Sequence, residues 1–152
     1  MRALPIAVVV TLAASLASVS RTGSAEPLGA VVISAFPSQF CCPEIGTWAA
    51  SGAVGDSGSY ERTEAATAPP DRPPFALGPF REVFVFTGSH GTFTIRAEER
   101  LAETGLTGVW QIASGTDDYA DASGHGTVAF YNGPPFTLSL TGVISKVAGG
   151  SA

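Results

Sequence analysis

The stretch "FREVFVFTGSHGTFTIRAEERL", from Phe80 to Leu101, carries the pattern that decides the fold. In its second half Phe93, Ile95 and Ala97 alternate with polar side chains, which is the period of a strand with one buried face. The short segment "TGSHG" separates this half from the apolar run before it. The stretch therefore predicts two antiparallel strands joined by a tight turn.

Similar segments recur along the chain, separated by glycine, proline, asparagine and aspartate. Further strands are expected at 29–36, 46–55, 57–65, 106–114, 126–131 and 136–145. The alternation in the last three directs inward Trp110, Ile112, Val128, Phe130, Phe136, Leu138 and Leu140. No segment keeps a helical period. Seven or eight short antiparallel strands at even spacing predict an all-β fold, either a closed barrel or a sandwich.

The first 25 residues have the layout of a secretory signal peptide, with Arg2, an uncharged run over 3–20, and small residues before Glu26. The run approaches the roughly 18 to 20 apolar residues of a membrane anchor, but Pro5 and its many Ala and Ser residues favour cleavage after Ala25. We expect a protein that is secreted, periplasmic or in the cell envelope, and not membrane-bound after cleavage. The expected parts are a signal peptide (1–25), an N-terminal segment (26–45), a single barrel domain (46–146) and a tail (147–152).

The charge of the chain argues against one class of partner. The sequence has 8 Lys and Arg residues, 13 Asp and Glu residues, and a formal net charge of −5. Loss of the signal peptide would remove two Arg residues and no acidic residue. Such a surface repels phosphate backbones, so nucleic acid is not expected as a partner. One Lys against seven Arg, with abundant Ala and Gly, is typical of a high-GC bacterial genome.

Cys41 and Cys42 are adjacent in the sequence. Neighbouring Cα atoms lie about 3.8 Å apart, below the usual ~4.4 to 6.8 Å of a disulfide, so a bridge between them would be strained and could act as a redox switch. Ordinary thiols, or a bridge that stiffens a turn, are favoured over a catalytic pair because no His follows nearby. A zinc site would need His90 and His125 to converge on the cysteines, and no spacing supports this. We expect neither a metal nor a cofactor.

Three aspartates, Asp117, Asp118 and Asp121, crowd into the Gly-rich segment between two apolar runs. A calcium loop would need the order Asp-x-Asp-x-Asp-Gly and a distant Glu, but the order is Asp-Asp-Tyr-Ala-Asp and Val128 stands at the last ligand position. The segment is therefore interpreted as the solvated rim of a turn.

Two patterns in the second half of the chain carry a family resemblance. The first consists of Ser114, Gly115, Thr116, Tyr119, Ala122 and Gly124, and the second of Phe136, Thr137, Leu140, Gly142 and Val143. The region from Phe80 to Ile144 resembles the allene oxide cyclase and dirigent barrel superfamily, and more narrowly small secreted bacterial proteins with a barrel of that kind. The resemblance implies an eight-stranded antiparallel barrel with an apolar interior. It also implies that Gly115 and Gly124 build the turn, that Tyr119 packs back against the barrel, and that Asp117, which tolerates a left-handed backbone, replaces a glycine.

Catalytic residues do not carry over with this resemblance. Allene oxide cyclases use a buried Glu and an Asn, but the early strand here has neither, and the single Asn132 lies in a turn. Dirigent proteins use paired acidic residues in the pocket. The candidates for that role are Asp56, Glu61, Glu64 and Glu82, which we expect to be exposed on outward strand faces. No nucleophile elbow or catalytic triad is recognisable.

Aromatic side chains are dense on the segments expected to line the barrel: Phe84, Phe86, Phe93, Trp110, Phe130 and Phe136. They form either plain core packing or the wall of a site for a small apolar or aromatic ligand. Three functions stay open. The favoured one is an exported, non-catalytic barrel that binds such a ligand. The others are a cyclase, isomerase or dirigent-like enzyme acting on a lipid-like or phenolic substrate, and a packed structural or interaction module that uses the Pro-rich loop 69–79.

Overall fold

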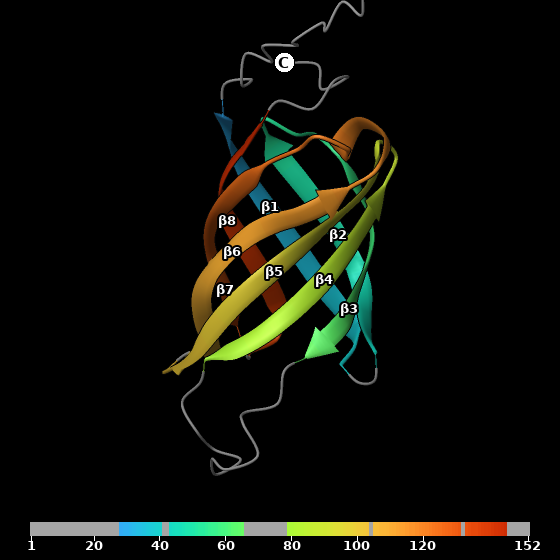
Figure 1. Cartoon of the computed structure of the whole chain (residues 1–152). Coiled ribbons are helices and arrows are strands. Elements are labelled where there is room, and N and C mark those ends of the chain that lie inside the picture. The colour runs from blue at the N-terminus through green and yellow to red at the C-terminus, as the bar shows by residue number, and fades with distance from the viewer. Residues whose placement is uncertain (1–27, 41–42, 66–78, 104, 132, 146–152) are drawn as a thin grey trace, which may run out of the picture.

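Eight antiparallel strands close into a barrel in the order in which they occur in the sequence (Figure 1). The computed structural model describes residues 28–40, 43–65, 79–103, 105–131 and 133–145. The strands are β1 (Leu28–Gln39), β2 (Glu44–Gly52), β3 (Ser57–Ala65), β4 (Phe80–Gly88), β5 (Gly91–Ala102), β6 (Gly105–Gly115), β7 (Gly124–Tyr131) and β8 (Thr137–Ser145). A 3-10 turn, η1 (Asp117–Tyr119), follows β6. The predicted all-β barrel is confirmed, and closure of the sheet decides against the sandwich.

The hairpin predicted from the opening stretch is formed by β4 and β5. Phe86 lies opposite Phe93 and Phe84 lies opposite Ile95, so the apolar faces of the two strands coincide. The barrel also takes in β1, which pairs with β2 on one side and with β8 on the other. The barrel therefore begins before the expected boundary at Gly46, and β1 covers what would otherwise be two open sheet edges.

Aromatic rings fill the barrel interior at the end where β4 turns into β5. This end is the upper one in Figure 1. Phe86 and Phe93 stack with ring centroids 5.0 Å apart, and Trp48 meets Phe93 edge-on at 5.3 Å. Tyr119 from η1 packs against Phe93 at 4.8 Å and is fully buried. Such pairs contribute about 0.5 to 1.5 kcal/mol each beyond the burial of their area, so this layer is a principal source of stability.

One of the residues expected to face inward lies differently. Phe136 is 38% exposed and precedes β8, because the pairing of β7 with β8 ends at Tyr131 and Thr137. Its ring instead contacts Phe40, with centroids 4.7 Å apart. Phe130 is half-buried and packs against the core from β7. Phe136 therefore lies beyond the last rung of the barrel rather than inside it.

The turn after β6 agrees with the role expected of its residues. Asp117 has a φ of 51°, in the left-handed region that glycine usually occupies. The Tyr119 hydroxyl donates to Asp56 Oδ2 at 2.8 Å, which ties η1 to the β2–β3 turn. A Cβ on Gly115 would collide with the Tyr119 backbone, so glycine is required there. Asp117, Asp118 and Asp121 are exposed.

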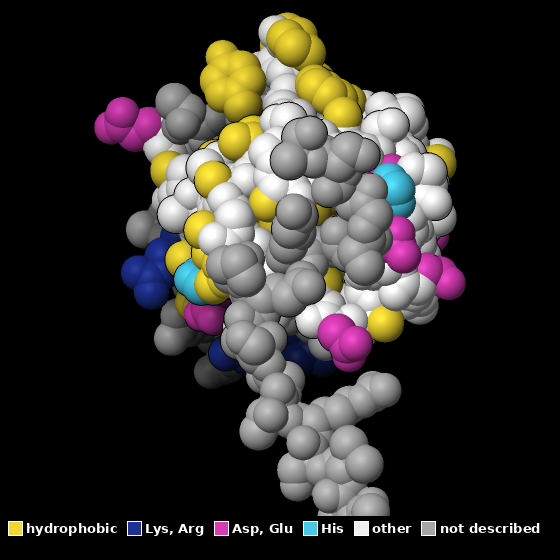
Figure 2. Space-filling model, turned by 90° about the horizontal axis from the view of Figure 1, so that it is seen from above, with side chains coloured by type: hydrophobic (Ala, Val, Ile, Leu, Met, Phe, Trp, Pro, Cys, Tyr) yellow, Lys and Arg dark blue, Asp and Glu magenta, His cyan; other side chains and the backbone are white. Residues whose placement is uncertain are grey.

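Several expectations concern parts of the chain outside the described residues: the signal peptide, Cys41 and Cys42, the Pro-rich loop except Pro79, and the tail 147–152. The part of the chain that the structure describes contains no helix long and apolar enough to cross a membrane. In the view from the upper end, the Asp and Glu side chains of the described residues are spread around the molecule, whereas their Arg side chains lie toward one side (Figure 2).

Candidate functional site in the barrel interior

The interior of the barrel changes from aromatic to charged toward its lower end in Figure 1. Four charged side chains from consecutive strands β2 to β5 make up this acidic cluster: Glu44, Arg62, Glu82 and Glu99. The alternation of each strand places them, because each is an even number of residues from a buried aromatic or apolar side chain on its own strand. The three Glu residues are 5%, 8% and 0% exposed, respectively. Charged residues are almost never buried to this extent unless they are paired.

Arg62 pairs with two of the three carboxylates. Its Nη1 lies 2.9 Å from Glu82 Oε1 and 3.2 Å from Glu44 Oε2. The Tyr60 hydroxyl donates to the other oxygen of Glu44 at 2.9 Å. A β-bulge between Arg62 and Glu64 interrupts the β3–β4 register next to this network. Bulges re-aim side chains locally, which is consistent with the inward direction of Arg62 in a strand whose later residues are exposed.

Glu99 differs from the other carboxyl groups because it is fully buried without a partner. Among the described residues, no protein group hydrogen-bonds to either of its carboxyl oxygens. Burial, with a smaller contribution from the charges of Glu82 and Glu44, raises the pKa of Glu99 to about 8, while Arg62 acts in the opposite direction. At neutral pH Glu99 is therefore mostly a neutral carboxyl group, which offers one O–H donor as well as acceptor oxygens. Burial also raises the pKa of Glu82, and Arg62 opposes this shift.

Trp110 supplies a second unpaired polar group close to Glu99 in the strand register. It is 2% exposed, and its indole Nε1 has no hydrogen-bond acceptor among the residues described. On β6 it lies opposite Ala97, which is two residues before Glu99 on β5. The other tryptophan, Trp48, donates its Nε1–H to the carbonyl oxygen of Thr87 at 3.1 Å. Of the two tryptophans, only Trp110 leaves its indole N–H unpaired, and this donor and the unpaired Glu99 carboxyl group lie on neighbouring strands.

The structure brings together four of the six aromatic residues predicted to line the barrel. Phe84, Phe86 and Phe93 form a continuous wall, and Trp110 is buried on β6. Phe130 and Phe136 lie at the edge of this set, as described above. This wall leads from the aromatic layer into the acidic cluster, because Phe84 is two residues from Glu82 on β4.

The acidic candidates divide into two kinds. Glu61 and Glu64 are exposed, as expected, but Glu82 and Asp56 are both 8% exposed, so the expectation of outward faces is wrong for these two. Asp56 lies at the opposite end from the cluster and accepts hydrogen bonds from Ser57, Ser89, His90 and Tyr119 at 2.8 to 3.3 Å. Burial opposes its ionisation, but these hydrogen bonds outweigh burial and hold the pKa of Asp56 below its usual value. Asp56 is therefore a structural anion that fastens three turns together.

Three members of the acidic cluster were missed by reasoning from the sequence: Glu44, Arg62 and Glu99.

Among the residues that the structure describes, which are 28–40, 43–65, 79–103, 105–131 and 133–145, no group of three or more His, Cys, Asp or Glu side chains could hold a metal ion. Comparison of the chain with protein-family models, with curated proteins and with solved structures found no match. The function of the cluster is therefore inferred from its geometry and chemistry alone.

Proposed function

We propose that this protein binds a small molecule inside the barrel, at the end where Glu99 and Trp110 face the interior. The observation that carries the proposal is that a fully buried carboxyl group and a buried indole N–H both lack protein partners on adjacent strands. Leaving such a group unpaired costs about 1 to 3 kcal/mol, and native proteins pair the large majority of their buried polar atoms. A ligand with complementary polar groups would offset that cost.

The surroundings favour a neutral ligand with an apolar body. The cluster holds three carboxyl groups against one guanidinium group, so an anionic headgroup would be repelled. A hydroxyl or carbonyl oxygen can accept from Trp110 and from the protonated Glu99. The aromatic wall formed by Phe84 and its neighbours suits a terpenoid, sterol-like or phenolic body. We therefore expect neutral terpenoid alcohols, ketones and phenols to bind more tightly than fatty acids.

A fluorescence titration tests this proposal. A Trp48→Phe background leaves Trp110 as the only tryptophan, and its emission is followed while a panel of terpenoid alcohols, phenols and fatty acids is added. A saturable change in emission is expected for the neutral ligands. In Glu99→Leu the affinity should fall at least tenfold, because the ligand loses its hydrogen bond to the Glu99 carboxyl group. Glu61→Gln, an exposed carboxyl on β3, is the matched control and should bind as the parent does. No saturable change across the panel would contradict the proposal.

An enzyme is the second candidate, and the protonation state of Glu99 favours it. Glu99, whose pKa is raised to about 8, belongs to the same cluster as the Arg62-paired carboxylates Glu44 and Glu82, so the interior holds a proton donor beside ion-paired carboxylates, as acid–base catalysis requires. Such a site could donate a proton to a bound ligand and assist its cyclisation or isomerisation. Chromatography of each ligand after incubation tests this: a product formed by the parent and lost in Glu99→Gln, with binding retained, would establish catalysis.

Two further points of the proposal rest on the sequence. We propose that the chain is exported, on the strength of the signal-peptide layout of residues 1–25. We also propose kinship with the allene oxide cyclase and dirigent barrels, supported by the two patterns between Ser114 and Val143 and by the eight-stranded barrel. A structural or interaction module is not favoured, because the buried and unpaired carboxyl group of Glu99 would lower the stability of a purely structural barrel and contribute nothing to it.

A further inference from the structure

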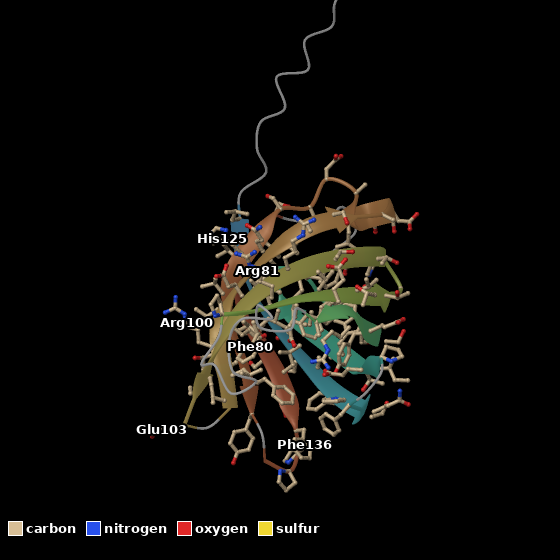
Figure 3. All side chains as sticks on the ribbon, turned by 60° about the horizontal axis from the view of Figure 1, so that its bottom comes forward. Phe80, Arg81, Arg100, Glu103, His125 and Phe136 are labelled. Atoms are coloured by element: carbon tan, nitrogen blue, oxygen red, sulfur yellow. The ribbon has the colours of Figure 1, made fainter. Side chains whose placement is uncertain are left out.

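A second site lies on the outer face of the barrel. A groove of about 1080 Å³ crosses five consecutive strands, from Thr63 on β3 to Gly126 on β7. The strand register sets its axis: Val83 lies opposite Arg96, Arg96 opposite Gln111, and Gln111 opposite His125. Figure 3 shows Arg81 and His125 on this side of the barrel, with Arg100 nearer the lower end.

The groove also shares a wall with the interior. Glu82 and Trp110 contribute to its lining, although both belong to the interior layer. The sheet itself therefore separates the two sites. The inference below goes beyond the proposed interior function and does not depend on it.

Arginine side chains gather on the outer face of β4 and β5, beside the carboxylates of Glu64 and Glu98 that also line the groove. Of the four described arginines, Arg62 lies in the interior cluster, and Arg81, Arg96 and Arg100 all face outward on β4 and β5. Within the described chain, neither Arg81 nor Arg96 has an acidic side chain within 4.0 Å, although Glu98 lies opposite Arg81 in the register. Both line the groove, so two guanidinium groups are available to an anionic partner.

The dimensions and the mixed lining decide what kind of anion fits. Five strands spaced about 4.8 Å apart span roughly 19 Å, which is the length of about six residues of extended peptide. A small inorganic anion would contact only the arginine pair. A uniform polyanion would be repelled by Glu64 and Glu98, which also line the groove. Val109, 58% exposed on the floor, offers an apolar contact beside the charged ones.

We propose that this outer groove binds an extended peptide segment of about six residues, with adjacent acidic side chains at its centre. Arg81 and Arg96 hold the two carboxylates, and an apolar side chain of the peptide packs on Val109. The strongest contacts are charge-assisted hydrogen bonds from guanidinium to carboxylate, so binding weakens as salt screens them.

Fluorescence anisotropy with a labelled hexapeptide, Ala-Val-Glu-Glu-Val-Ala, tests the assignment. Saturable binding at low salt is expected, and Arg81→Gln and Arg96→Gln should each weaken it about three- to fivefold, as for exposed ion pairs. Arg100→Gln is the matched control, because it makes the same change of charge on β5 outside the groove lining. It should leave the affinity unchanged. The same peptide with Gln in place of Glu should bind at least tenfold more weakly.

Three outcomes would overturn the proposal: no binding at millimolar peptide, an equal loss in Arg100→Gln, or full displacement by an equal concentration of succinate. The equal loss would indicate a general charge effect, and the displacement a site for small anions. Because the three arginines face solvent, their variants should keep the wild-type melting temperature, which circular dichroism checks. Glu99→Leu should bind the hexapeptide normally, so failure of the groove and failure of the interior site are distinguishable.

Discussion

Replacing Glu99 with glutamine should make the protein more stable at alkaline pH. The substitution keeps the size of the side chain and removes its ionisation. A carboxyl group whose pKa is raised in the folded state stays protonated there while the unfolded chain has already released the proton. The wild-type protein therefore loses stability as pH rises from the unfolded pKa toward the folded pKa, and the amide variant does not.

The size of the effect follows from the pKa of Glu99. Its value moves from 4.5 to about 8, and each pKa unit corresponds to 1.36 kcal/mol, so ionising this buried group costs up to about 5 kcal/mol. That is a large part of the ~5 to 15 kcal/mol by which domains are usually stable. Glu99→Gln should match the wild type near pH 4 and exceed it by several kcal/mol at pH 9. The buried carboxyl group of Glu82, whose pKa is also raised, likewise lowers the stability of the folded protein as pH rises, in the wild type and in the variant alike.

Guanidinium unfolding followed by tryptophan fluorescence at pH 4, 6 and 9 measures this difference. Exposed Glu61→Gln is the control and should run parallel to the wild type at all three values. If the wild-type and Glu99→Gln free energies also ran parallel from pH 4 to pH 9, Glu99 would have no raised pKa. The reasoning from burial and the neighbouring carboxylates would then be refuted.

Three further predictions concern other parts of the chain. Tyr119→Phe should cost about 1 to 3 kcal/mol of unfolding free energy, because it removes the hydrogen bond to Asp56, whereas exposed Tyr131→Phe should cost less than about 0.5; equal melts would refute this. Because the pKa of Asp56 is lowered on folding, its stabilisation should be lost as pH falls below about 3.9, and an Asp56→Asn variant should show no such loss in acid unfolding. Mass spectrometry of the exported protein should find Glu26 at its N-terminus, and intact Met1 in the membrane fraction would argue for an anchor.

The alternation of side chains was sufficient to predict the strands. The two strands expected within Phe80–Leu101 match β4 and β5 closely, because a period of two persists wherever one face of a strand is buried. The exposed position of Phe136 could not be predicted in this way. Phe136 comes two residues before the inward Leu138, so the alternation places it inside the barrel. Only the pairing of β8 with β7 shows that the sheet ends at Thr137.

The same alternation could have indicated the acidic cluster, but the cluster was not recognised from the sequence. On β5 the inward series Phe93, Ile95, Ala97 continues to Glu99, and on β4 the series Phe86, Phe84 continues to Glu82. A charged residue in such a series normally indicates that the strand has left the core, which is why the sequence predicts an exposed Glu82 and singles out no role for Glu99. The alternation alone, which places every second side chain inside the barrel, predicts the buried positions of Glu82 and Glu99 correctly. No local pattern, however, shows that Arg62 pairs with carboxylates from two other strands, because that contact depends on closure of the barrel.

The burial of Asp56 depends on even longer-range information. Its partners Ser89 and Tyr119 are 33 and 63 residues away in the sequence. An aspartate between two strands is ordinarily a solvated turn residue. Here the folded barrel brings the β4–β5 turn and η1 onto the same carboxylate.

The pairing of β1 with β8 also determines when the molecule becomes complete. These strands come from opposite ends of the described chain, and Leu28 lies opposite Ser145. During synthesis, β1 can form a hairpin with β2, but its other edge has no partner until the last strand has emerged. An open edge can pair with another chain, and contacts between distant residues form slowly. The open edge of β1 therefore leaves the chain prone to aggregation until β8 has emerged, and a partner or compartment that delays encounters between unfinished chains would raise the yield of folded protein.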